Sequence, residues 1–195
     1  MKKYILLCFL FLAFKNVNAQ RFETGGTIGY GRAYYHISEN NYNIEATASI
    51  KLDTIFLWLN SGLVFQRRGN PGPWLNFIKL PVGIDLAPGR RLRYVFGGGL
   101  YMSYCFAEQD EIEKLHNFQN FQIGTYFDLG LKYQITHSWN IFIKAQADID
   151  LSTLYENSIP SHFGEEEYEN VKSFAFTINF GFKYLIPKKT KSNKG

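Results

Sequence analysis

Polar and apolar residues alternate with a period of two through segment 173–184. Successive side chains of a β-strand point to opposite faces, so this period predicts a strand with one apolar and one polar face. The apolar positions are Phe174, Phe176, Ile178, Phe180, Phe182 and Tyr184. The opposite face carries Ser173, Ala175, Thr177, Asn179, Gly181 and Lys183.

Seven further segments resemble this one, with differing clarity. The clearest are 92–106, 121–133 and 139–151. The noisier ones are 22–35, 42–50, 54–66 and 75–86. Pro81 cannot donate a hydrogen bond to a neighbouring strand, so we expect a bulge or a local break there. The chain is therefore predicted to form eight strands.

The connections between these strands alternate in length. The short connections are 51–53, 87–91 and 134–138, and the longer ones are 36–41, 67–74, 107–120 and 152–172. Outer-membrane barrels have this asymmetry, with tight periplasmic turns and longer exterior loops. A tilted transmembrane strand needs about 9 to 11 residues, which each of these segments supplies. We expect an all-β fold, an eight-stranded antiparallel up-and-down transmembrane β-barrel.

Charged residues gather on the face opposite to the apolar one. They are Glu45, Lys79, Asp85, Arg93, Asp128, Lys132, Lys144, Asp148, Asp150 and Lys183. Side chains just fill the interior of an eight-stranded barrel, so opposite charges there have to pair. This predicts a narrow or plugged lumen and disfavours an open pore.

A secreted soluble ligand-binding barrel is the alternative that the alternation leaves open. Such a barrel would turn its apolar residues inward and its charges into water. Strand length and the unequal connections favour the membrane barrel. Aromatic residues near the predicted strand ends also suit interfacial girdles. They are Tyr42, Trp74, Tyr104, Phe121, Tyr133, Trp139 and Tyr184.

The N-terminus predicts export. Two lysines, a short apolar stretch and the small residues before Gln20 indicate a signal peptide over 1–19, with cleavage after Ala19. The barrel then occupies 20–187, and 188–195 form a basic periplasmic tail. Without the signal peptide the chain has 18 basic and 17 acidic residues, which gives no indication of nucleic-acid binding. Cys105 becomes the only cysteine, so no intrachain disulfide is expected.

Candidate chemistry is sparse and lies in the longer connections. His36, Ser38 and Glu39 supply a base, a nucleophile and an orienting group, the residue types of a lipid-modifying hydrolase. Two acidic clusters are read as solvated charge rather than as cation sites. One set comprises Glu108, Asp110, Glu111 and Glu113, and the other Glu156, Glu165, Glu166, Glu167 and Glu169.

A second and looser hydrolase set is Ser161, His162 and Glu165. Both sets are coincidences of composition unless the fold brings their members together, and we assign no catalytic residue. No motif for a cofactor or a metal is present.

Two stretches resemble a known family. Segment 75–83 is an apolar run into a proline, and 93–101 is a Gly-rich strand. Both are similar to the small outer-membrane β-barrel proteins of the Bacteroidota, called porin-like or PorT-like, as is the cleavage region at 17–20. The resemblance covers essentially the whole chain after the signal peptide. It implies a barrel in the outer membrane and no single activity. Members usually stop at an aromatic residue ending the last strand, so Phe182 or Tyr184 would act here as an internal insertion signal.

The sequence thus favours an outer-membrane β-barrel without enzymatic activity. It would act as a structural or accessory component, or by binding through its exterior loops. The expected partners are outer-membrane lipid and the barrel insertion machinery, and the barrel would be a monomer. A lipid-modifying hydrolase is the first alternative, and a secreted soluble ligand-binding barrel is the second.

Overall fold

A computed structural model describes residues 21–34, 38–52, 56–69, 74–106, 119–153, 155–160 and 166–186. Eight strands form a closed barrel, and two more form a separate small sheet. The barrel strands are β1 (Arg21–Tyr34), β2 (Ser38–Lys51), β3 (Leu57–Gly69), β4 (Leu75–Leu86), β5 (Leu92–Phe106), β6 (Phe121–Gln134), β7 (Trp139–Asp150) and β10 (Phe174–Ile186). The small sheet consists of β8 (Tyr155–Pro160) and β9 (Glu166–Val171).

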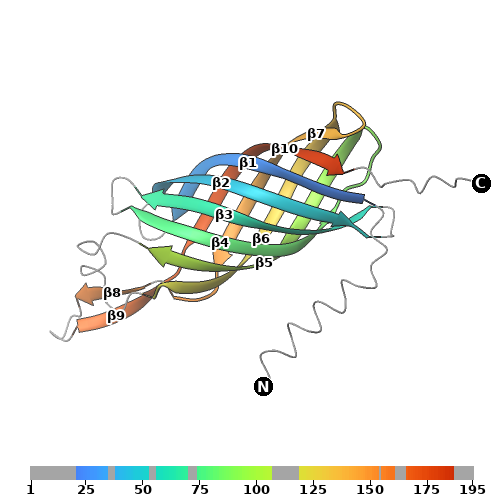
Figure 1. Cartoon of the computed structure of the whole chain (residues 1–195). Coiled ribbons are helices and arrows are strands. Elements are labelled where there is room, and N and C mark those ends of the chain that lie inside the picture. The colour runs from blue at the N-terminus through green and yellow to red at the C-terminus, as the bar shows by residue number, and fades with distance from the viewer. Residues whose placement is uncertain are drawn as a thin grey trace, which may run out of the picture.

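Each barrel strand pairs antiparallel with its neighbours along the chain, which confirms the predicted up-and-down topology (Figure 1). The barrel closes between its first and last strands. This seam runs without interruption from Phe22 opposite Ile186 to Tyr34 opposite Phe174. A closed sheet has no edge strand, so no row of unpaired backbone groups is left at its margin.

The two ends of the barrel differ in their connections. At one end, named here the short-turn end, β1 begins, β10 ends, and the connections 52–56, 87–91 and 135–138 join neighbouring strands. The opposite end, named the long-loop end, holds the connections 35–37, 70–74, 107–120 and 151–173. The hairpin of β8 and β9 extends beyond the barrel at the long-loop end (Figure 1).

The β8–β9 hairpin differs from the sequence prediction, which treated 152–172 as a connection. Its strands pair from Tyr155 opposite Val171 to Pro160 opposite Glu166. This polar, acidic segment lacks the alternation of the barrel strands. A hairpin needs only matched backbone hydrogen bonds between two adjacent segments, so it forms here without that signal.

The barrel is apolar outside and polar inside. Ile28 and Ile44 on the outer face are both 63% exposed, and Leu100 is 60% exposed. On the inner face Gln122 and Asn179 are fully buried. The predicted assignment of the two faces is thereby confirmed, and the structure has the opposite arrangement to that of a barrel with an apolar interior.

Pro81 interrupts one ladder, as expected, but without a bulge. Pairing of β3 with β4 runs up to Ser61 opposite Val82 and resumes at Val64 opposite Lys79 in the same register. The ladder to β5 continues through Pro81 opposite Tyr101. The two missing pairs are those that need an N–H at position 81, so the break follows from the absent donor.

Aromatic residues cluster at both ends of the barrel wall. Near the long-loop end the ring centroids of Tyr30 and Tyr42 lie 5.1 Å apart, and Tyr42 and Trp74 lie 6.3 Å apart. Near the short-turn end Trp139 lies 5.0 Å from Tyr184. The structure thus places aromatic residues in two groups, one at each end. Among the described residues, no helix is long and apolar enough to cross a membrane.

Candidate functional site

The interior of the barrel holds three layers of polar side chains. We name them by position: the Arg68 network towards the long-loop end, the Lys144 cluster in the middle, and the Glu23 cluster towards the short-turn end. Each arises because a strand with alternating faces turns every second side chain inward, so charges from distant parts of the chain meet on the axis.

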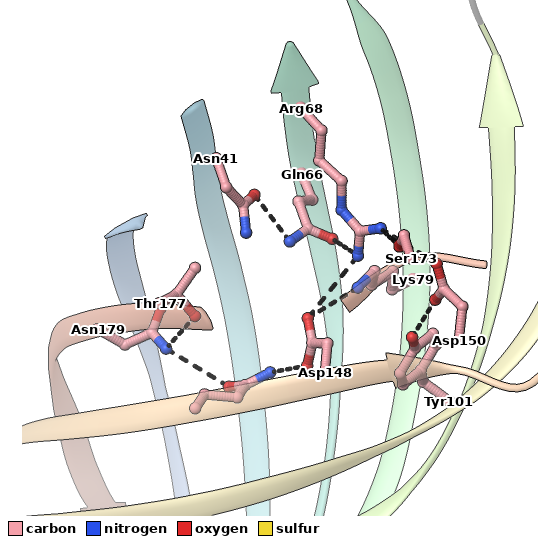
Figure 2. Close-up of polar contacts among 11 residues, drawn as sticks. Asn41, Gln66, Arg68, Lys79, Tyr101, Asp148, Asp150, Ser173, Thr177 and Asn179 are labelled. Atoms are coloured by element: carbon pink, nitrogen blue, oxygen red, sulfur yellow. Dashed lines mark hydrogen bonds and ion pairs between the residues drawn. The ribbon is translucent and has the colours of Figure 1, made fainter. Parts of the chain in front are cut away.

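Arg68 is the centre of the first layer and is completely buried (Figure 2). Its Nη1 donates to Asp150 Oδ2 at 3.2 Å and to the hydroxyl of Ser173. Its Nη2 donates to Gln66 Oε1 at 3.0 Å and lies 4.0 Å from Asp148 Oδ2. The guanidinium also stacks over the ring of Phe77, 4.6 Å from its centroid. Arg68 therefore connects β3 with β7 and with the segment that enters β10.

Lys79 supplies the second cation of the Arg68 network. Its Nζ donates to Asp148 Oδ2 at 2.9 Å and lies 4.3 Å from the centre of the Tyr101 ring. The Tyr101 hydroxyl donates to Asp150. Two buried cations thus face two buried carboxylates, and this layer is charge-balanced, which offsets the cost of removing four charges from water.

Neutral amides extend the Arg68 network to both sides (Figure 2). Gln66 Nε2 donates to Asn41 Oδ1 at 2.8 Å. Gln146 Nε2 donates to Asp148 Oδ1 at 2.8 Å, and Asn179 Nδ2 donates to Gln146 Oε1 at 3.4 Å. The network joins β2, β3, β4, β5, β7 and β10, so it crosses the barrel from wall to wall at this level.

The Lys144 cluster has more acidic than basic groups. Lys144 Nζ donates to Asp128 Oδ2 at 3.2 Å and lies 3.8 Å from Glu45 Oε2. Asp85 lines the same cavity of about 50 Å³, as does the ring of Tyr126. This space has the size of one or two water molecules. Gly83 leaves room for Tyr126, because an added Cβ would collide with its hydroxyl.

The Glu23 cluster has the opposite balance. Glu23 is 1% exposed and pairs with Lys132. Arg93 Nη1 lies 4.0 Å from Glu23 Oε1, and Asn140 Nδ2 donates to the same oxygen at 3.2 Å. Lys183 donates to Ser49 Oγ at 2.6 Å. One carboxylate therefore faces three cations at this level.

All ten charged residues predicted for the polar face belong to the interior strand faces. Eight of the ten form ion pairs, as predicted, for example through Lys79, Lys132 and Lys144. Lys183 instead donates to Ser49, and Asp85 forms no ion pair with the described residues. Two principal members of the lumen were missed. The prediction ended the third strand at Gln66 and left Arg68 in an exterior connection, which is wrong, because β3 continues to Gly69. Glu23 was overlooked in a Gly-rich segment.

The missed signals are present in the sequence. Alternation continues from Val64 and Gln66 to Arg68, with Arg67 on the outer face next to Trp74, 4.3 Å from its ring centroid. Arg68 continues the inward-facing positions at the end of the strand. Because it is charged, such a residue is easily taken for part of a loop. Only the pairing of β3 with β2 and β4, which extends to Arg68, fixes its place.

The candidate catalytic sets fall largely outside the described residues. His36, Ser161, His162 and Glu165 lie there, as does the side chain of Ser38. Glu39 is half-buried at the long-loop end of β2. The signal segment 1–19, the tail 188–195 and the acidic segment 107–118 also lie outside. In the part of the chain that the structure describes, no group of three or more His, Cys, Asp or Glu is placed to hold a metal ion.

No family model matches the chain, and no curated protein matches it. Solved structures do match the chain. Neisserial surface protein A is similar with a TM-score of 0.58 and 12% identity, over 84% of this chain and 96% of that one. The outer membrane enzyme PagL is similar with a TM-score of 0.52 and 10% identity, over 84% of this chain and 99% of that one. The outer membrane protein OprG from Pseudomonas aeruginosa is similar with a TM-score of 0.52 and 9% identity, over 86% and 96%.

These neighbours include one enzyme, so the shared architecture does not decide between enzymatic and non-enzymatic roles. The likeness extends over nearly the full length of each neighbour at low identity, which makes it a likeness of fold. The closed eight-stranded antiparallel barrel of this chain has the fold of the small outer-membrane β-barrels.

Proposed function

We propose that this protein is an outer-membrane β-barrel whose outer face contacts lipid. The outward side chains support this assignment. Apolar residues such as Ile28, Ile44 and Leu100 cover the wall all round and remain mostly exposed. Soluble monomers rarely expose apolar patches of more than a few hundred Å². Each large apolar side chain gains about 1.5–3 kcal/mol on leaving water, and acyl chains supply that environment.

We further propose a non-enzymatic role, as a structural or accessory component or through binding by the long-loop end. The observation that favours such a role over that of an open pore is the Arg68 network, whose charged members Arg68, Lys79, Asp148 and Asp150 are all at most 4% exposed. They interlock across the lumen at one level. A solute crossing the barrel would have to break these buried pairs, so the lumen is closed.

Sequence features at the two ends of the chain complete the proposal. A signal peptide over 1–19 would export the chain, and the barrel insertion machinery would recognise Phe182 or Tyr184 near the end of β10. The resemblance to the porin-like barrels of the Bacteroidota fits this route. In the membrane the protein would be a monomer, with the short-turn end in the periplasm.

Planar-bilayer recording tests the closed lumen. Purified barrel inserted into a bilayer in molar salt should show no discrete conductance steps. The double variant Arg68→Ser with Gln66→Ser removes two side chains that fill the cross-section, and we expect it to conduct. Arg67→Ser is the matched control, because Arg67 lies on the outer face, and it should stay silent.

Steady single-channel currents from the unaltered protein would contradict the proposal. They would show that ions find a way past the Arg68 network. Heat-dependent gel mobility shows whether the double variant is folded. If the folded double variant does not conduct, another layer of the lumen blocks the ions.

A further inference from the structure

The short-turn end of the barrel opens into a cavity of about 840 Å³. Its basic lining residues are Arg21, Lys51, Arg90, Arg91 and Arg93. Phe56, Trp58 and Ala87 form an apolar part of its wall, and Gln134, Thr136 and His137 add polar groups. The cavity is thus concave, strongly basic and partly apolar.

Among the described residues, the cavity has far more basic than acidic groups around it. None of the described residues that line it is a carboxylate. Among the described residues, Glu23 on the inner side lies 4.0 Å from Arg93 Nη1, but it is also paired with Lys132 and hydrogen-bonded by Asn140. Five cations therefore converge on one space, and a concave site with one sign of charge concentrates ions of the other sign.

Two of the arginines, Arg91 and Arg93, are held in place by neutral acceptors. Arg91 Nε donates to the Gln134 carbonyl oxygen at 3.3 Å. Arg93 donates to the Arg90 carbonyl oxygen at 3.1 Å and to Gln134 Oε1 at 3.4 Å. These hydrogen bonds orient both guanidinium groups with neutral acceptors, and only Arg93 also has a carboxylate partner, Glu23. Because the groups are already oriented, less conformational entropy is lost when an anion binds.

The turn that carries Arg90 and Arg91 is itself well defined. Gly89 has a φ of 123°, a conformation that L side chains rarely adopt, and an added Cβ would collide with the Leu92 carbonyl oxygen. Tyr94 N donates to the Pro88 carbonyl oxygen at 3.1 Å, and Gln134 N donates to that of Arg91 at 2.8 Å. A rigid turn thus presents both arginines to the cavity.

We propose that this cavity binds the phosphate group of a glycerol-phosphate-like ligand, either a lipid headgroup or a free phosphorylated solute. Planar guanidinium groups match phosphate oxygens with paired hydrogen bonds, which explains the use of arginine at four of the five basic positions. The apolar wall at Phe56, Trp58 and Ala87 accommodates the organic part of the ligand. The binding site does not depend on a closed lumen; the outer-membrane assignment only makes the cavity face the periplasm.

Isothermal titration calorimetry on the full barrel in dodecyl maltoside tests this proposal. This detergent carries no charge and does not compete for the cations. Two probes share one phosphate group: glycerol 3-phosphate is the solute, and dihexanoyl phosphatidic acid is the lipid. Glycerol and dihexanoylglycerol are their matched controls without phosphate. In physiological salt, at least one phosphate probe should bind saturably, and neither control should do so.

Variants locate the site. Arg90→Gln together with Arg91→Gln should weaken binding by about tenfold or more, because two charge-assisted hydrogen-bond donors are lost. Arg67→Gln removes an arginine at the opposite end and should leave the affinity within about twofold. Both substitutions affect exposed side chains, and heat-dependent gel mobility confirms that each variant is folded.

Each outcome is decisive. Binding of glycerol 3-phosphate identifies a soluble phosphorylated ligand, and binding of dihexanoyl phosphatidic acid alone identifies a lipid headgroup. The proposal is overturned if neither phosphate probe binds the unaltered barrel, if dihexanoylglycerol binds as well as the acid, or if the Arg90/Arg91 variant keeps full affinity. None of these results bears on conductance, so failure here and failure of the closed lumen are separable.

Discussion

At the residue scale, the interior is governed by the pairing of buried charges. Arg68 has hydrogen bonds to Asp150, Ser173 and Gln66, and it stacks on Phe77. A buried ion pair adds little net stability, because desolvation offsets the attraction between its members. Removing one member is different, since the partner then stays buried and uncompensated.

Arg68→Met tests this asymmetry. The variant leaves Asp150 without its cation and should lower the free energy of unfolding by about 3–5 kcal/mol, measured by urea denaturation in lipid vesicles. Arg67→Met is the control: Arg67 is exposed next to Trp74, and its loss should cost at most about 1 kcal/mol. Adding Asp150→Asn to Arg68→Met should recover part of the loss. Equal effects of the two arginine substitutions would contradict the role assigned to the network.

At the element scale, alternation predicts where the strands lie, but it does not predict where they begin and end. The cleanest segments were placed within a residue or two, since β5 and β6 begin at the predicted Leu92 and Phe121. The predicted third strand was displaced by three residues at each end, because segment 54–66 is apolar nearly throughout and alternates clearly only near its end. Because of that displacement, Arg68 was assigned to a connection instead of the strand. Partner strands, and not local pattern, decide where such a strand begins and ends.

Pro81→Ala tests the cause of the gap between β3 and β4. The new N–H can donate to Gly62 in β3 and restore the two missing pairs. The added hydrogen bond contributes about 0.5–1.5 kcal/mol, and the more flexible unfolded chain offsets about 0.4–1 kcal/mol of it. Stability should therefore change little, while the amide of residue 81 becomes strongly protected from hydrogen exchange. Pro88→Ala, in the turn before β5, is the control and should gain no such protection. A fast-exchanging amide at position 81 would assign the gap to another cause.

At the scale of the whole molecule, the polarity is the reverse of that of a soluble domain. The outer wall is apolar, the axis is charged, and both faces come from the same strands. Closure of β1 on β10 is what separates them, since an open sheet would leave the charged face in water. The basic cavity at one end and the hairpin of β8 and β9 at the other further distinguish the two ends.

A lipid-soluble carbene probe tests this arrangement directly. In reconstituted barrel, photolabelling should mark Phe176 and Phe180, whose rings point outward, and spare Lys132 and Lys144 on the axis. Peptide mapping by mass spectrometry identifies the labelled positions. Thr177 and Asn179 lie between the two phenylalanines on the same strand and serve as internal controls for the inner face. Labelling of the lysines in preference to the phenylalanines would mean that the barrel is inside out.

The sequence by itself determined the eight barrel strands, their order and their two faces, because a period of two is a local property that backbone geometry converts directly into a face. It also predicted that interior charges must pair. Only the tertiary structure decided which charges pair, since Glu23 meets Lys132 across 109 residues and Arg68 meets Ser173 across 105. Such partners are set by the register of closed ladders. The same closure gathers Arg21, Lys51, Arg90, Arg91 and Arg93 around one cavity, although no motif in the chain joins them.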